Sequence, residues 1–151
     1  MPVIRKATER DIEAVCRLIG QMSPMGFRHD YTNAIDKFRS HISGNPDYFL
    51  WVAELSGNIA GTAMMHLQHK LSYHCGTAAH LEDVVVDHAY RGQGIGAELV
   101  REALTTARKA GLLQDHAHAI QDRRLRYERF GFCQHDIGMR LDLKEQLYEK
   151  E

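Results

Sequence analysis

Three glycines alternate at Gly92, Gly94 and Gly96, where an apolar, β-branched run ends and a helical pattern begins. Glycine tolerates sharp turns and lets a ligand approach the backbone closely, because it has no Cβ. The N-terminus of the helix that follows offers unpaired N–H groups and a partial positive charge. Residues 84–96 therefore predict a site that binds a diphosphate-containing ligand.

Two nucleotide-binding motifs do not fit this loop. The dinucleotide fingerprint requires G-x-G-x-x-G, whereas this loop reads G-x-G-x-G and continues with Ala97. A P-loop requires Lys and then Ser or Thr after its last glycine, but Gly96 is followed by Ala97 and Glu98. A different class of diphosphate ligand is therefore expected.

The loop at residues 91–96, Arg-Gly-Gln-Gly-Ile-Gly, resembles the R/Q-x-x-G-x-G/A loop of the GNAT family of N-acetyltransferases. Residues 126–132 resemble the F-Y-x-x-x-G-F signature of that family, and the resemblance extends over residues 3–143. It implies an α/β GNAT fold with a mixed, mostly antiparallel sheet. Six to seven strands and about four helices are expected, with the sheet splayed between the fourth and fifth strands.

Hydrophobic patterns along the chain agree with this order of elements. Helical spacing follows Thr8, which is a suitable N-cap residue. The expected segments are strands over 3–6, 48–55, 59–68, 80–87, 112–120 and 132–143, and helices after Thr8 and over 30–42, 96–110 and 122–130. With 151 residues and no linker-like stretch, the chain is expected to form one domain, residues 1–151.

The resemblance implies direct attack of an amine on acetyl-CoA, which serves as co-substrate, without a covalent enzyme intermediate. Backbone N–H groups at a strand end, expected at a β-bulge, would hold the pantetheine arm and face the thioester oxygen; these belong to Val84, Val85 and Val86. Backbone N–H groups of the loop would bind the pyrophosphate; these belong to Arg91, Gly92, Gln93, Gly94, Ile95 and Gly96. Tyr127 aligns with the tyrosine near the thiol sulfur and would act as general acid, the alternative being a core aromatic.

Glu82 is the candidate base, because family members often place a carboxylate there facing the acceptor amine. Asp83 would point to the opposite face if the strand were regular. Charge complementarity to the acceptor, without proton abstraction, is an equally compatible role for Glu82. The structural alternative is that both carboxylates cover a solvated strand end.

One departure from the family pattern precedes Tyr127. The family usually has an asparagine and an alanine there, whereas residues 123–126 read Arg-Arg-Leu-Arg. Arg123 is therefore a candidate ligand of the cofactor phosphates. A solvated helix face is the alternative for all three of these arginines.

The segment at residues 70–86 is similar to the C-G-x-x-x-H-I-E-D-V-V-V run of the glucosamine-6-phosphate N-acetyltransferase subgroup. That likeness implies that Glu82 and Asp83 line the acceptor site and that the protein is a homodimer. It also implies a cation for the substrate phosphate, for which the candidates are Arg28, His29, Arg39 and Arg140.

Other acceptors and another class of protein stay open. Aminoalkylphosphonate N-acetyltransferases share the His-Leu-Gln stretch at residues 66–68, and a peptide or protein amine is a third possibility. A non-catalytic acyl-CoA-binding module would keep the glycine loop but would not need Tyr127 or Glu82, and this chain has both.

Composition excludes several partners. The net charge of −1 leaves no electrostatic footprint for nucleic acid, and no apolar run is long enough to span a membrane. Three scattered cysteines without a Cys-x-x-Cys pair, and residues 1–6 without the apolar core of a signal peptide, favour reduced thiols in the cytoplasm. The ten histidines show no coherent ligand spacing, so no metal is expected.

Overall fold

A mixed sheet lies at the centre of the computed structural model, which describes residues 1–22, 31–110, 114–117 and 127–133. The strand order is β1-β2-β3-β4-β5, with antiparallel pairs from β1 to β4 and a parallel pair between β4 and β5. The strands are β1 (Val3–Lys6), β2 (Tyr48–Leu55), β3 (Asn58–His69), β4 (Thr77–Val86) and β5 (Gln114–Ala117). The expected mixed, mostly antiparallel sheet is confirmed. The described part of the chain holds five strands rather than six to seven, and most of residues 132–143 lies outside it.

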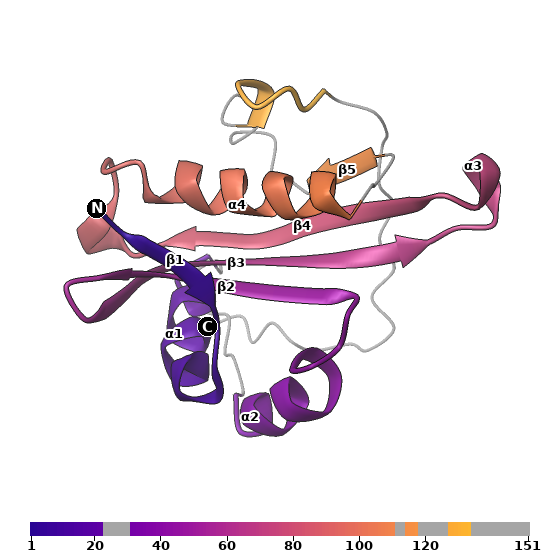
Figure 1. Ribbon diagram of the computed structural model, residues 1–151. Coiled ribbons are helices and arrows are strands. Elements are labelled where there is room, and N and C mark those ends of the chain that lie inside the picture. The colour runs from indigo at the N-terminus through magenta and orange to yellow at the C-terminus, as the bar shows by residue number, and fades with distance from the viewer. Residues whose placement is uncertain (23–30, 111–113, 118–126, 134–151) are drawn as a thin grey trace, which may run out of the picture.

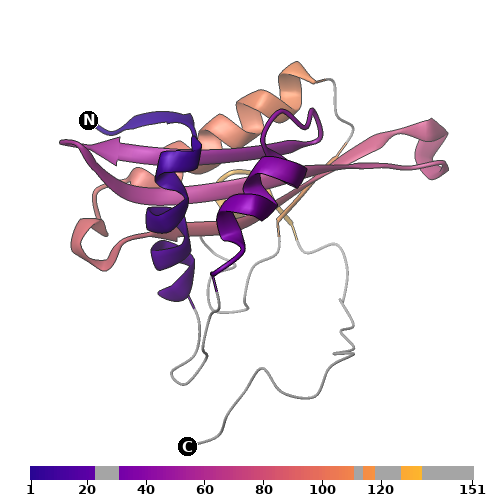
Figure 2. The ribbon, with the colours of Figure 1, turned by 90° about the horizontal axis from the view of Figure 1, so that it is seen from below.

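Helices cover both faces of this sheet. The α-helices are α1 (Ile12–Gly20), α2 (Ala34–Lys37), α3 (Ser72–Cys75) and α4 (Ile95–Lys109). Figure 1 shows α4 along one face and α1 and α2 against the other, and Figure 2 shows the α1 and α2 side in front. The helix expected over 30–42 is wrong as a single α-helix, because α2 gives way to a π-helical turn, Phe38–Ile42.

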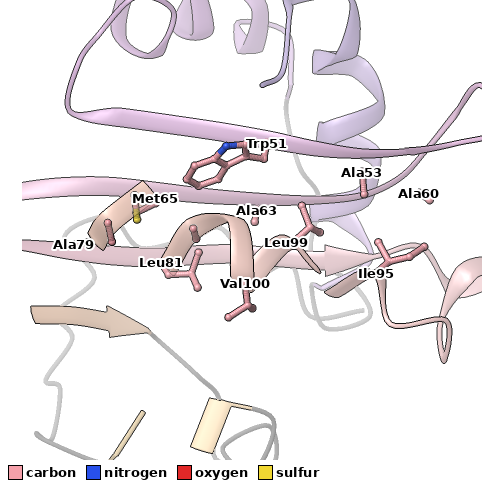
Figure 3. Close-up of a cluster of buried hydrophobic side chains, with 12 residues drawn as sticks. Trp51, Ala53, Ala60, Ala63, Met65, Ala79, Leu81, Ile95, Leu99 and Val100 are labelled. Carbon is pink, nitrogen blue, oxygen red and sulfur yellow. The ribbon is translucent and has the colours of Figure 1, made fainter. Parts of the chain in front are cut away.

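The core between α4 and the sheet follows from helical spacing. Ile95, Leu99, Val100, Ala103 and Ala107 are all buried and recur along one side of α4. Their partners on β2, β3 and β4 are Trp51, Ala63, Met65, Ala79 and Leu81. Figure 3 labels these side chains, except Ala103 and Ala107, and shows the labelled ones between the strands and the helix. Packing on this face fixes the start of α4 relative to the end of β4.

On the opposite face, a buried carboxylate joins the start of α1 to strand β1. Asp11, just before α1, accepts hydrogen bonds from the Arg5 guanidinium at 2.8 and 2.9 Å and from the Thr8 N–H at 2.7 Å. Hydrogen bonding to Arg5 outweighs burial and lowers the Asp11 pKa to about 2. The predicted start of a helix after Thr8 is confirmed, with a 3-10 turn Glu9–Asp11 leading into α1.

No helix in the described ranges, which leave gaps at 23–30, 111–113, 118–126 and 134–151, is long and apolar enough to cross a membrane.

Candidate functional site

A β-bulge interrupts β4 next to Val84, Val85 and Val86, the residues predicted to hold the pantetheine arm. Thr62 of β3 pairs with Val85, but Met64 pairs with Glu82, so β4 carries one extra residue between these pairs. Asp83 has φ of 52°, the left-handed conformation that aspartate tolerates better than most residues. Bulges of this kind bend a strand and redirect its side chains. The structure therefore contains the bulge that was expected in this part of the strand.

The bulge changes where the two acidic side chains lie. Alternation of side chains holds only in a regular strand, so the expectation that Asp83 opposes Glu82 does not apply. Burial, and then the charges of Cys16 and Asp83, raise the pKa of Tyr31, which packs against the apolar cluster that includes α1 residues. Burial, and secondarily the Glu82 charge, raises the pKa of Asp83 itself. Asp83 is thus partly buried, and it does not simply cover a solvated strand end.

Glu82 is held by a histidine on the neighbouring strand. Its Oε1 lies 3.1 Å from Nδ1 of His66, and the two side chains are 34% and 30% exposed. The His66 ring stacks between Tyr48 of β2 and His80 of β4, with centroids 5.7 and 4.9 Å away. The sequence pattern alone, in which the histidines show no ligand spacing, does not predict this cluster. Their alternate spacing on paired strands is the signal that could have found the cluster.

The loop after β4 adopts the conformation that its glycines allow. Gly92 and Gly94 have φ of 80° and 81°, where a side chain would be strained. Gly94 is the N-cap residue of α4, so the helix begins at Ile95, one residue earlier than predicted. Gly96 is helical and needs no positive φ, and a Cβ there would meet Val86 Cγ2 at 3.4 Å.

Amide groups gather at this end of α4. The N–H groups of Ala97 and Glu98 both donate to the carbonyl of Gly94, at 2.9 and 3.2 Å. Ile95 and Gly96 precede this first intrahelical bond, and their amides belong to the group that a helix leaves without internal partners. A helix N-terminus with such free amides attracts an anion.

The side chains at the loop's two ends are anchored differently. Gln93 is exposed, and the exposed Arg91 donates from Nε to the carbonyl of Val86 at 3.2 Å. This bond keeps the Arg91 side chain beside the end of β4. The Ile95 side chain is buried in the core, so only its backbone is available to a ligand.

The three valines beyond the bulge line both faces of the strand end. Val85 is buried opposite Thr62, whereas Val84 and Val86 pack on the α4 side. Pairing of β4 with β5 is described from Ala78 to Leu81, before Glu82 begins the bulged segment. The strand end and the glycine loop are thus adjacent, as predicted.

Tyr127 lies on the α4 side of the sheet. It is partly buried, packs against the α4 core and meets the edge of Phe132 with centroids 5.7 Å apart. This placement agrees with a core aromatic, and it also brings the phenol to the cluster that contains Val84 and Val86. Its role as general acid stays a prediction.

Several predicted cationic residues lie outside the described residues. These are Arg28, His29, Arg123 and Arg140. Arg39 is described, and its guanidinium is engaged by Glu9 and by Asp36. Hydrogen bonding to Glu9 raises the pKa of Arg39. Among the residues that the structure describes, no cluster of three or more His, Cys, Asp or Glu side chains could hold a metal ion.

A family comparison decides what this arrangement of strand, bulge and glycine loop belongs to. The sequence profile of the Acetyltransferase (GNAT) family matches residues 12–132, which is most of the chain and includes the loop and Tyr127. The chain belongs to the GNAT family. This confirms the predicted family and the predicted enzyme class, an acetyl-CoA-dependent N-acetyltransferase.

Individual relatives of this GNAT protein narrow the comparison. Over 88 residues it is 35% identical to glucosamine 6-phosphate N-acetyltransferase of Trypanosoma brucei brucei, covering 58% of the chain and 60% of that enzyme. Aminoalkylphosphonate N-acetyltransferase of Salmonella typhimurium is 31% identical over 113 residues, 74% of the chain and 71% of its own length. The chain thus spans less than two thirds of the trypanosome enzyme.

The fold of the GNAT protein is matched over nearly its whole length. The crystal structure of glucosamine-6-phosphate N-acetyltransferase from Arabidopsis thaliana has a TM-score of 0.80 and 26% sequence identity. The match covers 95% of this chain and 99% of that one. Together these relatives confirm the predicted α/β GNAT fold and the predicted likeness to the glucosamine-6-phosphate subgroup.

Proposed function

We propose that this protein moves an acetyl group from acetyl-CoA to the primary amine of a small acceptor by direct attack. The bulge at Asp83 carries the proposal, because it interrupts the ladder of β4 immediately before the glycine loop. A coenzyme laid along this strand end would meet amides of Val84 to Val86 and then the mouth of α4.

The pyrophosphate is assigned to the loop amides. Gly92 and Gly94 allow the backbone of residues 91–96 to turn so that successive N–H groups converge. The helix dipole of α4 favours the negative charge there, and Arg91 adds a cation nearby. Arg123 is proposed as a further phosphate ligand.

The pantetheine arm is assigned to the gap where the sheet would splay between β4 and β5. The pairing of these strands is described from Ala78 to Leu81, and residues 82–86, farther along β4, are proposed to hold the arm. An N–H from Val84, Val85 or Val86 would donate to the thioester oxygen and stabilise the charge that develops there.

The acid and base are assigned to Tyr127 and Glu82. Glu82 takes a proton from the acceptor ammonium, and the free amine attacks the thioester carbonyl carbon. The tetrahedral intermediate expels the coenzyme A thiolate, which Tyr127 protonates. The phenolate then regains its proton from the nitrogen of the product. Proximity of amine and thioester supplies much of the acceleration.

Glucosamine 6-phosphate is the first candidate acceptor, and an aminoalkylphosphonate is the alternative. Relatives named for these two substrates match the chain at similar identity. Both substrates join an amine to a phosphorus oxyanion. The carboxylates of Glu82 and Asp83 would face the amine, and Arg28 and Arg140 are proposed for the oxyanion. Acceptance of a peptide or protein amine is an outcome of the same test.

A homodimer in the cytoplasm is also proposed. The support is the resemblance to the glucosamine-6-phosphate subgroup and the absence of a cysteine pattern typical of disulfides. Analytical ultracentrifugation at several protein concentrations tests the dimer, and a monomer at all of them would contradict it.

Thiol release from acetyl-CoA over a panel of amines tests the proposed reaction. The panel includes glucosamine 6-phosphate, 1-aminoalkylphosphonates and a lysine peptide, with wild type and Tyr127→Phe compared. We expect release with one of the phosphorus-bearing amines and a fall in kcat of about 10²-fold in the variant. Binding of acetyl-CoA without release with any amine would favour the non-catalytic binding module instead.

A further inference from the structure

We infer that His66 is a positioning residue, which acts on the reaction through Glu82 by fixing the orientation of that carboxylate. The inference rests on the proposed function, in which Glu82 receives the proton of the acceptor amine. His66 lies on β3 and takes no part in binding the coenzyme in that scheme.

The contact between the two residues fixes the tautomer of the imidazole. Nδ1 of His66 lies 3.1 Å from Oε1 of Glu82. An ionised carboxylate can only accept hydrogen bonds, so Nδ1 carries the hydrogen and donates it to Oε1. Oε2 of Glu82 is then the oxygen that meets the acceptor amine.

Stacking holds the imidazole in place. In the strand register, His66 is the direct partner of Tyr48 on one side and of His80 on the other. Its ring lies 23° from the plane of the Tyr48 ring and 10° from that of the His80 ring. His80 is held in turn by Gln68, whose Oε1 lies 2.9 Å from His80 Nε2.

The row of rings therefore spans three strands and ends at a carboxylate beside the bulge. Glu82 follows His80 by two residues on β4, so both side chains lie on the same face as His66. A base whose orientation is set before the substrate binds loses less freedom on the way to the transition state. Removing the donor should slow the chemical step more than it weakens acceptor binding, since the charge of Glu82 remains.

Two substitutions separate the donor from the stack. His66→Phe keeps a ring between Tyr48 and His80 but has no donor. His66→Asn loses the ring but places an amide N–H near the position of Nδ1. We expect His66→Phe to lower kcat about tenfold with less than a threefold change in acceptor KM. His66→Asn should recover most of that loss.

A double-mutant cycle tests whether His66 acts through Glu82. In a Glu82→Gln background, His66→Phe should change kcat by less than twofold, because the carboxylate that it positions is gone. His69→Phe is the control, because His69 bonds to Asp47 and Thr77 instead and should leave kcat unchanged. Thermal melting checks that each variant folds, and His66→Leu, which also lacks a donor, replaces His66→Phe if the latter does not.

The outcomes distinguish the inference from the proposed function. A tenfold loss that persists in the Glu82→Gln background, or a His66→Asn variant as slow as His66→Phe, overturns the inference and leaves the proposed reaction standing. A wild-type protein that releases no thiol with any amine overturns both.

Discussion

Gln21 and Asp87, 66 residues apart in the sequence, are joined by a hydrogen bond of 3.2 Å from the Gln21 side-chain amide to the Asp87 carboxylate. The carbonyl oxygen of the same amide accepts from the N–H of His88 at 3.2 Å. Gln21 follows the last residue of α1, and Asp87 follows the last residue of β4. The Gln21 side chain thus joins the end of α1 to the segment that leads from β4 into the glycine loop.

Loss of this contact should weaken coenzyme binding. Gln21→Ala removes both hydrogen bonds, so the loop that begins at Asp87 has to be ordered when the coenzyme binds. We expect the Kd for coenzyme A to rise about three- to tenfold, measured by calorimetry, with little change in melting temperature. Asn58→Ala, at the exposed start of β3, is the control. An unchanged Kd in Gln21→Ala would show that the loop is held without this contact.

The partly buried carboxylate of Asp83 should cost stability. Its pKa is raised mainly by burial, so the folded protein holds that proton more tightly than the unfolded chain does. Stability from this group is therefore complete below the ordinary pKa of 3.8 and is lost as pH rises through the folded value. Asp83→Asn should raise the melting temperature at pH 7 by a few degrees.

The same substitution should reduce acetyl transfer if Asp83 lines the acceptor site. Asparagine also tolerates the left-handed backbone of the bulge, so the substitution changes mainly the charge. A steady-state comparison should show a higher acceptor KM. A variant that is both less stable and fully active would contradict the assignment.

The ion pair of Asp11 and Arg5 should make the free energy of unfolding fall at low pH. The Asp11 pKa is lowered from 3.8 to about 2, first by hydrogen bonding to Arg5, and the residue is 6% exposed. A lowered pKa adds stability that is present above 3.8 and is lost as pH falls through 2. That difference corresponds to about 2 kcal/mol.

Denaturant unfolding between pH 2 and 7 measures this contribution. Asp11→Asn should lower the free energy of unfolding at pH 7 by about 2–3 kcal/mol and flatten its fall in acid. Asp36→Asn, an exposed carboxylate of α2, should leave the free energy nearly unchanged. Equal losses of unfolding free energy in the two variants would mean that the Asp11–Arg5 pair contributes no more stability than an exposed ion pair.

Local sequence patterns were enough to predict most of the sheet and the helix beside the proposed coenzyme site. The strand over 48–55 has the predicted bounds, and α4 begins and ends one residue from its predicted ends. Helical spacing predicts α4 because one face of this helix is buried, whereas the strand over 48–55 is buried on both faces and appears as a continuous apolar run. Gly94 was predicted for a different reason, namely that alternating glycines at the start of a helix indicate a sharp turn.

The β-bulge and the contact between His66 and Glu82 depend on how neighbouring strands pair, so the sequence of a single strand does not predict them. The extra residue at Asp83 is visible only in the register between β3 and β4, so alternation along β4 alone does not predict where its side chain lies. The contact between His66 and Glu82 likewise depends on which residues stand opposite each other. Sequence reasoning found Glu82 and missed the residue that holds it.

The central claim is that the N-terminus of α4 binds the pyrophosphate of the coenzyme. Coenzyme binding to two variants of Gly94 tests it most directly. Asparagine and aspartate have the same size and both tolerate the positive φ of Gly94, so they differ there only in charge. A Cβ at Gly94 meets nothing within 4 Å in the described part of the protein, so the loop can keep its shape.

Calorimetric titration with acetyl-CoA compares Gly94→Asp with Gly94→Asn. If the mouth of α4 holds the pyrophosphate, the aspartate should raise Kd at least about 10²-fold above the asparagine, because it sets a carboxylate against phosphate. Equal affinities in the two variants would place the coenzyme elsewhere and contradict the account.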